Sequence, residues 1–261
     1  MSMPMFQVDA FARRRFEGNP AAVIALPEFP ADTELQAIAA EHNLAETAFI
    51  VPAGSDYRLR WFTPTVEVPL CGHGTLASAA VVMERLEPER SAVVFHTASG
   101  ALGVRRDGAG YRMDFPVRRP RSVDAPSGLA VALGAAPREV ATDGVNLIVR
   151  LADAATVRGL APDLVAIARF DVAGIVVTAA GEGDYDFTSR YFAPAKGIPE
   201  DPVTGGAHCA LAPFWAERLG RHQFRAWQAS ARGGELGVRL AGDRVELTGT
   251  CVFYSEGRLC A

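Results

Sequence analysis

The sequence predicts an α+β protein made of two similar halves. Two observations carry this prediction: the chain repeats itself at an offset of 133 residues, and each copy holds one strongly apolar helix among strand-like segments. A length of 261 residues allows one large domain or two smaller ones, and the repeat favours two. We expect residues 1–118 to form the N-terminal half and residues 119–261 the C-terminal half, with the last strand a candidate to cross back to the first half.

The repeat is clearest around the two apolar helices. Glu, Pro, Gly, two Ala and a closing Glu-Arg-Leu coincide between the two longest copies. The matching pairs of segments are residues 67–86 with 200–219, residues 61–64 with 191–194, and residues 102–105 with 236–239. Because several elements keep nearly the same offset, we interpret the chain as an internal duplication.

The sequence predicts strands, helices and a closing hairpin in the same order in each half. Aromatic and charged residues alternate over 58–62 and 187–192 in the manner of strands, and one helix in each half is strongly periodic. In the first half we expect, in order, strand 5–8, helix 32–41 with Asp32 as its cap, strands 48–51 and 58–62, helix 75–86, and a hairpin of 92–106 with 111–115. In the second half we expect strand 145–150, helix 162–168, strands 174–178 and 187–192, helix 209–219, and a hairpin of 235–240 with 244–248.

The two helices that follow the glycine-rich turns should be buried. Leu76, Ala79, Ala80 and Met83 share one face of the first, and the second is nearly apolar all round at its start. We therefore expect the strands of each half to curl around the helix of that half as a mostly antiparallel sheet. Asp107-Gly108 and Ala241–Asp243 supply the left-handed residues that the closing hairpins need.

Composition excludes several classes of protein. Apolar residues make up 49% and charged residues 21%, which is ordinary globular usage. The net charge of −4 argues against nucleic acid as a partner, and no apolar run is long enough to span a membrane. The N-terminus lacks the layout of a signal peptide, and the four cysteines include no C-x-x-C pair. We expect a cytoplasmic protein with reduced thiols.

The two turns that precede the apolar helices are candidate binding sites. Residues 71–75 read Cys-Gly-His-Gly-Thr and residues 204–208 read Thr-Gly-Gly-Ala-His. The first amides of a helix lack intrahelical partners and carry partial positive charge, so two such ends facing one cleft would hold a small anion. The alternative interpretation is that these glycines only permit tight turns.

Glu46 is the candidate acid/base group. It lies between an expected helix and strand, and the second copy has Val172 in its place. Burial beside Leu44 and Phe49 would raise the pKa of its carboxyl toward the range that a general base needs. The alternative is a solvated surface glutamate.

The five histidines are not spaced as a zinc site, so we expect no metal. His73 is a candidate to polarise substrate or donate a proton, or else a structural capping residue. The sequence contains neither a Gly-x-Ser-x-Gly nucleophile elbow nor a Walker Gly-x-x-x-x-Gly-Lys motif. Nothing in it therefore supports a hydrolase or a nucleotide-binding protein.

Five motifs together resemble the PhzF-like family of phenazine-biosynthesis isomerases. They are residues 17–23 (EGNPAAV), 44–49 (LAETAF), 61–64 (WFTP), 70–76 (LCGHGTL) and 200–208 (EDPVTGGAH). The resemblance covers the chain from end to end. It implies the diaminopimelate epimerase fold, in which the active site lies between two similar halves, with no metal or organic cofactor. Dimerisation is typical of the resemblance.

The resemblance also implies roles for individual residues. Glu46 would remove a C–H proton and return it to another carbon, while His73 and Asp201 would hold the amino and carboxylate groups of a small carboxylate substrate. The expected substrate-binding residues are Gly72, Gly74, Thr75, Gly205, Gly206 and Ala207. The best-known family member isomerises trans-2,3-dihydro-3-hydroxyanthranilate. This chain has Gly206 where a serine is usual, which removes one possible hydrogen bond to substrate, so the resemblance does not identify the substrate.

Two alternatives to a single-base isomerase remain. A racemase or epimerase of this fold uses two thiols, but Thr204 stands where the partner of Cys71 should be, and a threonine hydroxyl is too weak an acid to replace it. A non-catalytic small-anion-binding protein would need no acid/base group. Cys71 itself is either a reactive thiol at a helix N-terminus or a small buried side chain.

Overall fold

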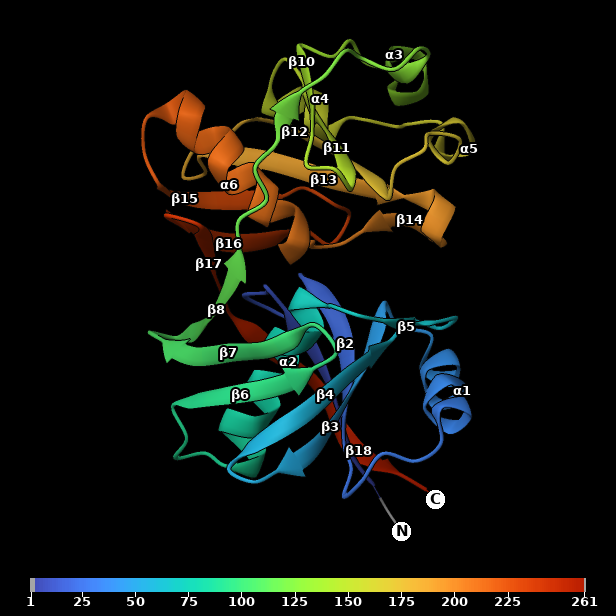
Figure 1. The fold of residues 1–261 in the computed structure, drawn as a ribbon, viewed down its shortest axis with the longest axis vertical. Coiled ribbons are helices and arrows are strands. Elements are labelled where there is room, and N and C mark those ends of the chain that lie inside the picture. Colours follow the sequence, from blue (N-terminus) through green and yellow to red (C-terminus); the bar gives the residue numbers. More distant parts are fainter. Residues whose placement is uncertain (1–2, 261) are drawn as a thin grey trace. The chain divides into compact units, whose positions relative to one another are not determined.

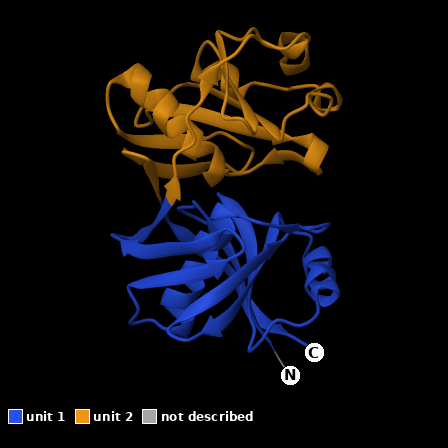
Figure 2. Ribbon diagram, in the orientation of Figure 1, with its two compact units in different colours: residues 1–114, 248–261 blue, residues 115–247 orange. Residues whose placement is uncertain are grey.

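The computed structural model describes residues 3–260, which form two compact units (Figure 2). The first unit comprises Met1–Asp114 together with Thr248–Ala261. The second unit comprises Phe115–Leu247. The division after Asp114 lies a few residues before the boundary that the sequence suggests.

The first unit is a mixed sheet with two helices. Its elements are β1 (Met3–Ala10), β2 (Asn19–Ala25), α1 (Asp32–His42), β3 (Glu46–Ala53), β4 (Asp56–Phe62), β5 (Glu67–Val68), α2 (Gly72–Val81), β6 (Ala92–Thr97), β7 (Gly100–Asp107), β8 (Gly110–Pro116) and β18 (Cys251–Leu259). A π-helical turn, Val82–Leu86, extends α2. The last strand of the chain, β18, pairs antiparallel with β1 along its whole length.

Helix α2 is the core of the first unit. Every residue from His73 to Val81 is buried, because the helix contacts β1, β2, β3, β7 and β18. The strands therefore curl around this helix, as its apolar sequence predicts (Figure 1). Small residues such as Ala77 and Ala80 let the strands approach closely.

Strands β2 and β3 are covered on both faces. Five consecutive residues of β3, Thr47–Val51, are buried, a pattern typical of a strand with cover on both sides rather than one. Helix α1 supplies one cover through Leu35 and Ala39, which pack with Phe49 and Val51. The two strands run parallel, with Ala21 opposite Glu46.

The second unit has the same kinds of elements with more short helices. They are β9 (Arg121–Ser122), α3 (Leu129–Leu133), β10 (Glu139–Thr142), β11 (Asn146–Arg150), α4 (Ala154–Arg158), α5 (Leu164–Ile167), β12 (Gly174–Ala180), β13 (Phe187–Ala193), a 3₁₀ turn (Pro194–Lys196), β14 (Ile198–Asp201), α6 (Gly205–Leu219), β15 (Gln223–Gln228), β16 (Gly234–Ala241) and β17 (Arg244–Gly249). Helix α6 is mostly buried, as α2 is.

The order of strand pairing is the same in the two units. In the first, β2–β3 is parallel, β3–β4 antiparallel, β4–β6 parallel and β6–β7 antiparallel. In the second, β11–β12, β12–β13, β13–β15 and β15–β16 repeat that series. The strand pairing is thus mixed but mostly antiparallel, as the sequence predicts.

Several local expectations were wrong. Asp32 is not the cap of α1: the cap position is Ala31, and the Asp32 carboxylate instead accepts a hydrogen bond from Arg60 Nη1 at 2.9 Å. Residues 92–106 are not one strand, because Thr97 Oγ1 bonds the carbonyl of Gly100 and closes a turn between β6 and β7.

Both long apolar helices begin earlier than their apolar periodicity suggests. Helix α2 starts at Gly72 and α6 at Gly205, so the glycines form the first helical turn instead of a loop before it. Among residues 3–260, no helix is long and apolar enough to cross a membrane.

Candidate active site

The first turn of α2 is held in place by Cys71. This residue is the N-cap, and its Sγ accepts a hydrogen bond from the Gly74 amide at 3.3 Å. A side chain at position 74 could not be accommodated, since a Cβ there would lie 2.8 Å from Cδ1 of Trp61. Glycine at this position therefore lets the start of the helix lie against the indole.

Glu46 and His73 form a buried ion pair. His73 is the second residue of α2 and Glu46 the first residue of β3, and the two side chains meet with Nε2 of His73 2.9 Å from Oε2 of Glu46. The side chain of His73 is 5% exposed and that of Glu46 is 13% exposed. The expected acid/base residue and its expected partner thus lie in direct contact, largely away from water.

The other ring nitrogen of His73 faces two further side chains. Nδ1 lies 3.1 Å from Nδ2 of Asn19 and 3.6 Å from Sγ of Cys71. Asn19 is fully buried at the start of β2, next to the start of β3. Four residues from three elements therefore form one connected polar cluster: Asn19, Glu46, Cys71 and His73.

Burial and neighbouring charge act in opposite directions on this cluster. Burial raises the pKa of the Cys71 thiol, and the Glu46 carboxylate raises it further, so the sulfur is a thiol at neutral pH. Burial disfavours the imidazolium form of His73, but the Cys71 sulfur and the Glu46 carboxylate outweigh it and raise the pKa of His73 well above its usual value. Because Cys71 stays protonated, we assign this effect chiefly to Glu46.

Glu46, Cys71 and His73 offer three ligand atoms within 4.8 Å of one another, a spacing that a divalent ion could bridge. The ring, however, meets the sulfur with Nδ1 and the carboxylate with Nε2. A metal ion bound by Cys71, Glu46 and one nitrogen of His73 would need that nitrogen near both the sulfur and the carboxylate. The imidazole would have to turn and break one of its two present contacts to reach that position. As they stand, these contacts place the sulfur and the carboxylate at opposite nitrogens of the ring.

In the second unit, Asp201 is bonded to the residue that precedes α6. Thr204 Oγ1 donates to Oδ2 of Asp201 at 2.5 Å. Gln228 is buried in β15. Its Oε1 accepts a hydrogen bond from the Thr204 amide at 2.8 Å, and its Nε2 donates one to the Asp201 carbonyl at 2.8 Å. Asp201 and the start of α6 are therefore tied to each other and to the sheet.

His208 is a buried neutral histidine, not a second acid/base group. Its Nδ1 lies 2.9 Å from the Thr204 carbonyl, and its ring stacks on Phe187. Complete burial lowers the pKa of His208 to about 4, so the ring is uncharged at neutral pH and Nδ1–H donates to the carbonyl.

The six expected substrate-binding residues differ in what their polar groups already bond. The Thr75 hydroxyl and amide both donate to the Cys71 carbonyl, the Gly74 amide donates to Cys71 Sγ, and the Ala207 amide donates to the Thr204 carbonyl. Gly72, Gly205 and Gly206 occupy first helical turns, where helix geometry leaves amides without intrahelical partners. Their binding role stays a prediction.

Asn19 and Gln228 were missed as members of these clusters. Asn19 stands in the Gly-Asn-Pro stretch that opens β2. That stretch lies within the family motif of residues 17–23, which is the sequence signal that points to it. Gln228 follows an aromatic residue in an ordinary strand, and nothing in its local sequence marks it.

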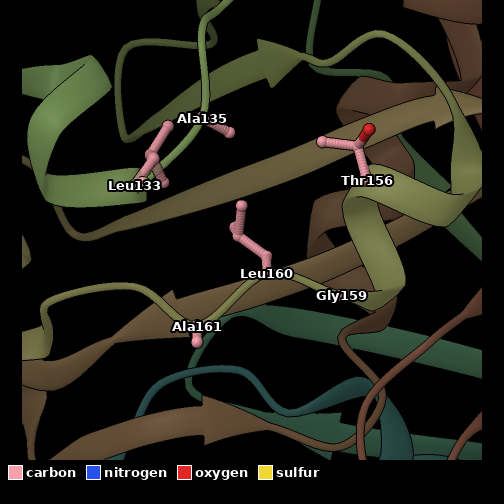
Figure 3. Close-up of a pocket in the computed structure, with 7 residues that line it drawn as sticks. Leu133, Ala135, Thr156, Gly159, Leu160 and Ala161 are labelled. Carbon is pink, nitrogen blue, oxygen red and sulfur yellow. The ribbon is translucent and has the colours of Figure 1, made fainter.

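A hollow in the second unit is separate from these residues. It has a volume of about 350 Å³ and lies between the end of α3 and the segment after α4 (Figure 3). Its lining residues are Leu133, Gly134, Ala135, Thr156, Gly159, Leu160 and Ala161. None of them is titratable, so this hollow lacks the groups that acid/base chemistry needs.

Two solved structures show which proteins share this fold. A PhzF-family phenazine biosynthesis protein from Enterococcus faecalis superposes with a TM-score of 0.97 at 40% identity, over 100% of both chains. A probable proline racemase from Agrobacterium radiobacter shares the fold alone, with a TM-score of 0.63 at 13% identity over 99% of this chain and 93% of that one. The chain therefore has the fold of the PhzF-family protein, and the probable proline racemase shares that fold.

The sequence comparisons are more specific. The phenazine biosynthesis-like protein family matches residues 8–257. An uncharacterized isomerase of Pseudomonas aeruginosa is 48% identical over 259 residues, covering 99% of both chains, and a human phenazine biosynthesis-like domain-containing protein is 39% identical over 288 residues, covering 100% of both. The chain belongs to the phenazine biosynthesis-like, or PhzC-PhzF, family.

Proposed function

We propose that this protein is a cofactor-independent isomerase that moves a proton between two carbons of a small carboxylate-bearing substrate. The observation that carries the proposal is the buried pair of Glu46 and His73 at the start of α2. A carboxylate held largely out of water beside a helix N-terminus combines a base with a site for an anionic substrate.

In this proposal Glu46 is the only group that exchanges a proton with carbon. Its carboxylate takes a proton from a C–H bond that the substrate's own unsaturated group acidifies, and the bonding electrons move into that group. The same carboxyl then returns the proton to a second carbon. The reaction shifts a double bond without oxidation or reduction, and Glu46 ends as it began.

His73 would act on Glu46 and on the substrate without carrying the transferred proton. Its Nε2 lies 2.9 Å from the Glu46 carboxylate and would hold that carboxylate in place for proton transfer. The first amides of α2 and the partial positive charge of the helix end would hold the substrate carboxylate nearby. Asp201 and the first amides of α6 are proposed to bind the other polar groups of the substrate, as the family resemblance implies.

Two observations count against the alternatives. A two-base racemase needs a base at position 204, but a threonine hydroxyl is too weak an acid to ionise near neutral pH, and that of Thr204 already donates to Asp201 and accepts from Gln228 Nε2. A protein that only binds anions gains nothing from Glu46, because a carboxylate beside the anion weakens binding.

The proposal is tested by incubating the protein in D₂O with trans-2,3-dihydro-3-hydroxyanthranilate, a methylitaconate and trans-4-hydroxy-L-proline, and following each by proton NMR. We expect a double-bond shift in an unsaturated carboxylate, with deuterium entering the product wherever the Glu46 carboxyl exchanges its proton with solvent before it protonates the second carbon. Epimerisation of hydroxyproline without any double-bond shift would instead support the racemase. Binding of all three compounds without deuterium exchange into any of them would support a non-catalytic binding protein.

A further inference from the structure

We propose that Asn19 is a positioning residue that fixes the ring orientation of His73 and places the proton of the neutral ring on Nε2, toward Glu46. Only the expected loss of kcat in Asn19 variants rests on the proposed function. The arrangement of the three side chains stands independently of any substrate.

The backbone that leads to Asn19 is built to deliver it to one place. Gly18 has a φ of +67°, and a Cβ there would lie 2.1 Å from the Ala10 carbonyl oxygen, so only glycine permits this approach of β2 to β1. Phe11 and Phe16, in the same connection, also have positive φ values of 59° and 75°. Bulky residues adopt this conformation at a cost, and such strain concentrates at functional sites.

Strand pairing then brings Asn19 beside Glu46. Ala10 pairs with Asn19 across β1 and β2, and Ala21 lies opposite Glu46 across β2 and β3. Both residues thus stand at the same end of adjacent parallel strands. The first turn of α2 brings His73 to that end, where it contacts both of them.

The donors around the ring select one tautomer. The Asn19 side chain presents Nδ2, a donor, to Nδ1 of His73 at 3.1 Å. Cys71 presents a thiol to the same nitrogen at 3.6 Å, and its sulfur already accepts from the Gly74 amide. With two donors directed at it, Nδ1 of the neutral ring serves as the acceptor, which leaves the ring proton on Nε2.

At high pH, where the His73 ring is neutral, the choice of tautomer decides whether its contact with Glu46 is attractive or repulsive. With a proton on Nε2, the 2.9 Å contact is an electrostatic attraction between the ring N–H and the carboxylate. With the proton on Nδ1, a nitrogen lone pair would face the carboxylate at the same distance. Asn19 touches no reacting atom in this account, and it acts through His73 alone.

The test is nitrogen-15 NMR of the histidine rings in the substrate-free protein, from pH 6 to pH 10. The His73 signals are assigned by their loss in His73→Gln. In the parent protein we expect the neutral ring at the high-pH end to carry its proton on Nε2. In Asn19→Asp the carboxylate would accept from Nδ1–H, so the transition to the neutral ring moves up by roughly 1 to 3 pH units. In Asn19→Ala we expect a mixture of the two tautomers.

Two results would overturn the inference. One is a neutral parent ring protonated on Nδ1, and the other is an unchanged tautomer and titration in both variants. Because no substrate is used, neither result depends on the proposed isomerase. With a substrate in hand, both variants should lose about 100-fold in kcat with little change in KM. Thr178→Val, which removes a buried hydroxyl in the second unit, is the folding control.

Discussion

His73 and Glu46 are 27 positions apart in the chain, yet their side chains meet at 2.9 Å because β3 starts where α2 starts. Neither residue is placed by its own segment alone. The parallel pairing of β2 with β3 sets Glu46, and the Cys71 cap sets the first turn that carries His73. The pair is thus a product of the sheet and the helix together.

The close approach of β1 and β2 predicts a difference between two glycine substitutions. Gly18→Ala places a Cβ 2.1 Å from the Ala10 carbonyl in a left-handed backbone, and we expect a loss of roughly 3 kcal/mol or more in the free energy of unfolding. Gly54 has a similar φ of +62° with nothing within 4 Å, so Gly54→Ala should lose about 1 kcal/mol. Denaturant unfolding measures both, and equal losses would contradict the role given to Gly18.

Buried His208 predicts a loss of stability in mild acid. The pKa of His208 is about 4 in the folded chain and 6.5 when exposed, so between these values the unfolded chain binds more protons than the native one. Stability should therefore fall as the pH drops from 6.5 to 4, by roughly 3 kcal/mol from this group.

His208→Asn, which keeps a donor for the Thr204 carbonyl, should flatten that slope, while His222→Asn, at an exposed position, should not. Unfolding is measured across this pH window, and the slope rather than the absolute stability is compared. An unchanged slope in His208→Asn would count against a buried neutral ring.

The cysteines predict a simple thiol count. Cys260 is exposed, whereas Cys71 and Cys209 are buried and burial raises the pKa of Cys251 well above its usual value. We expect an aromatic disulfide reagent at pH 7.5 to titrate one thiol quickly and the remainder only after denaturation. Cys260→Ser should remove the fast phase. Fast modification of Cys71 would favour the reactive-thiol alternative, because a two-thiol racemase needs a thiolate there.

Chelation tests the interpretation of the Glu46, Cys71 and His73 cluster. Because the ring meets the sulfur and the carboxylate with different nitrogens, we expect prolonged dialysis against EDTA to leave turnover within about twofold of the untreated protein. Turnover that is lost on chelation and restored by zinc would require the imidazole to rearrange and would replace the general-base role of Glu46.

The sequence predicts the repeated elements well where the pattern is local. Apolar periodicity locates α2 and α6, and Asp107-Gly108 marks the β7–β8 turn, where Gly108 has a φ of +58°. Strand β2 escapes notice because Pro20-Ala21-Ala22 shows no alternation, being covered on both faces. The turn between β6 and β7 escapes prediction because it is closed by a hydrogen bond from the Thr97 side chain and lacks the Asn-Gly dipeptide typical of hairpin turns.

The candidate site could be predicted only as a set of residues. Motif resemblance points to Glu46 and His73, but their contact depends on strand register between segments far apart in the chain. Asn19 joins the cluster for the same reason. The bonds that occupy the Thr75 hydroxyl and the Gly74 amide follow from the helix starting at Gly72, a start that apolar periodicity cannot locate in a glycine-rich stretch.

Solvent deuterium incorporation into a turned-over carboxylate substrate shows whether Glu46 is the base, when it is measured for Glu46→Gln beside Glu34→Gln on the exposed face of α1. Loss of a positioned general base costs about 10²- to 10⁴-fold, so Glu46→Gln should fall by that factor in both turnover and incorporation while Glu34→Gln matches the parent. Parent-like turnover in Glu46→Gln, with its fold intact by circular dichroism, would contradict single-base catalysis by Glu46.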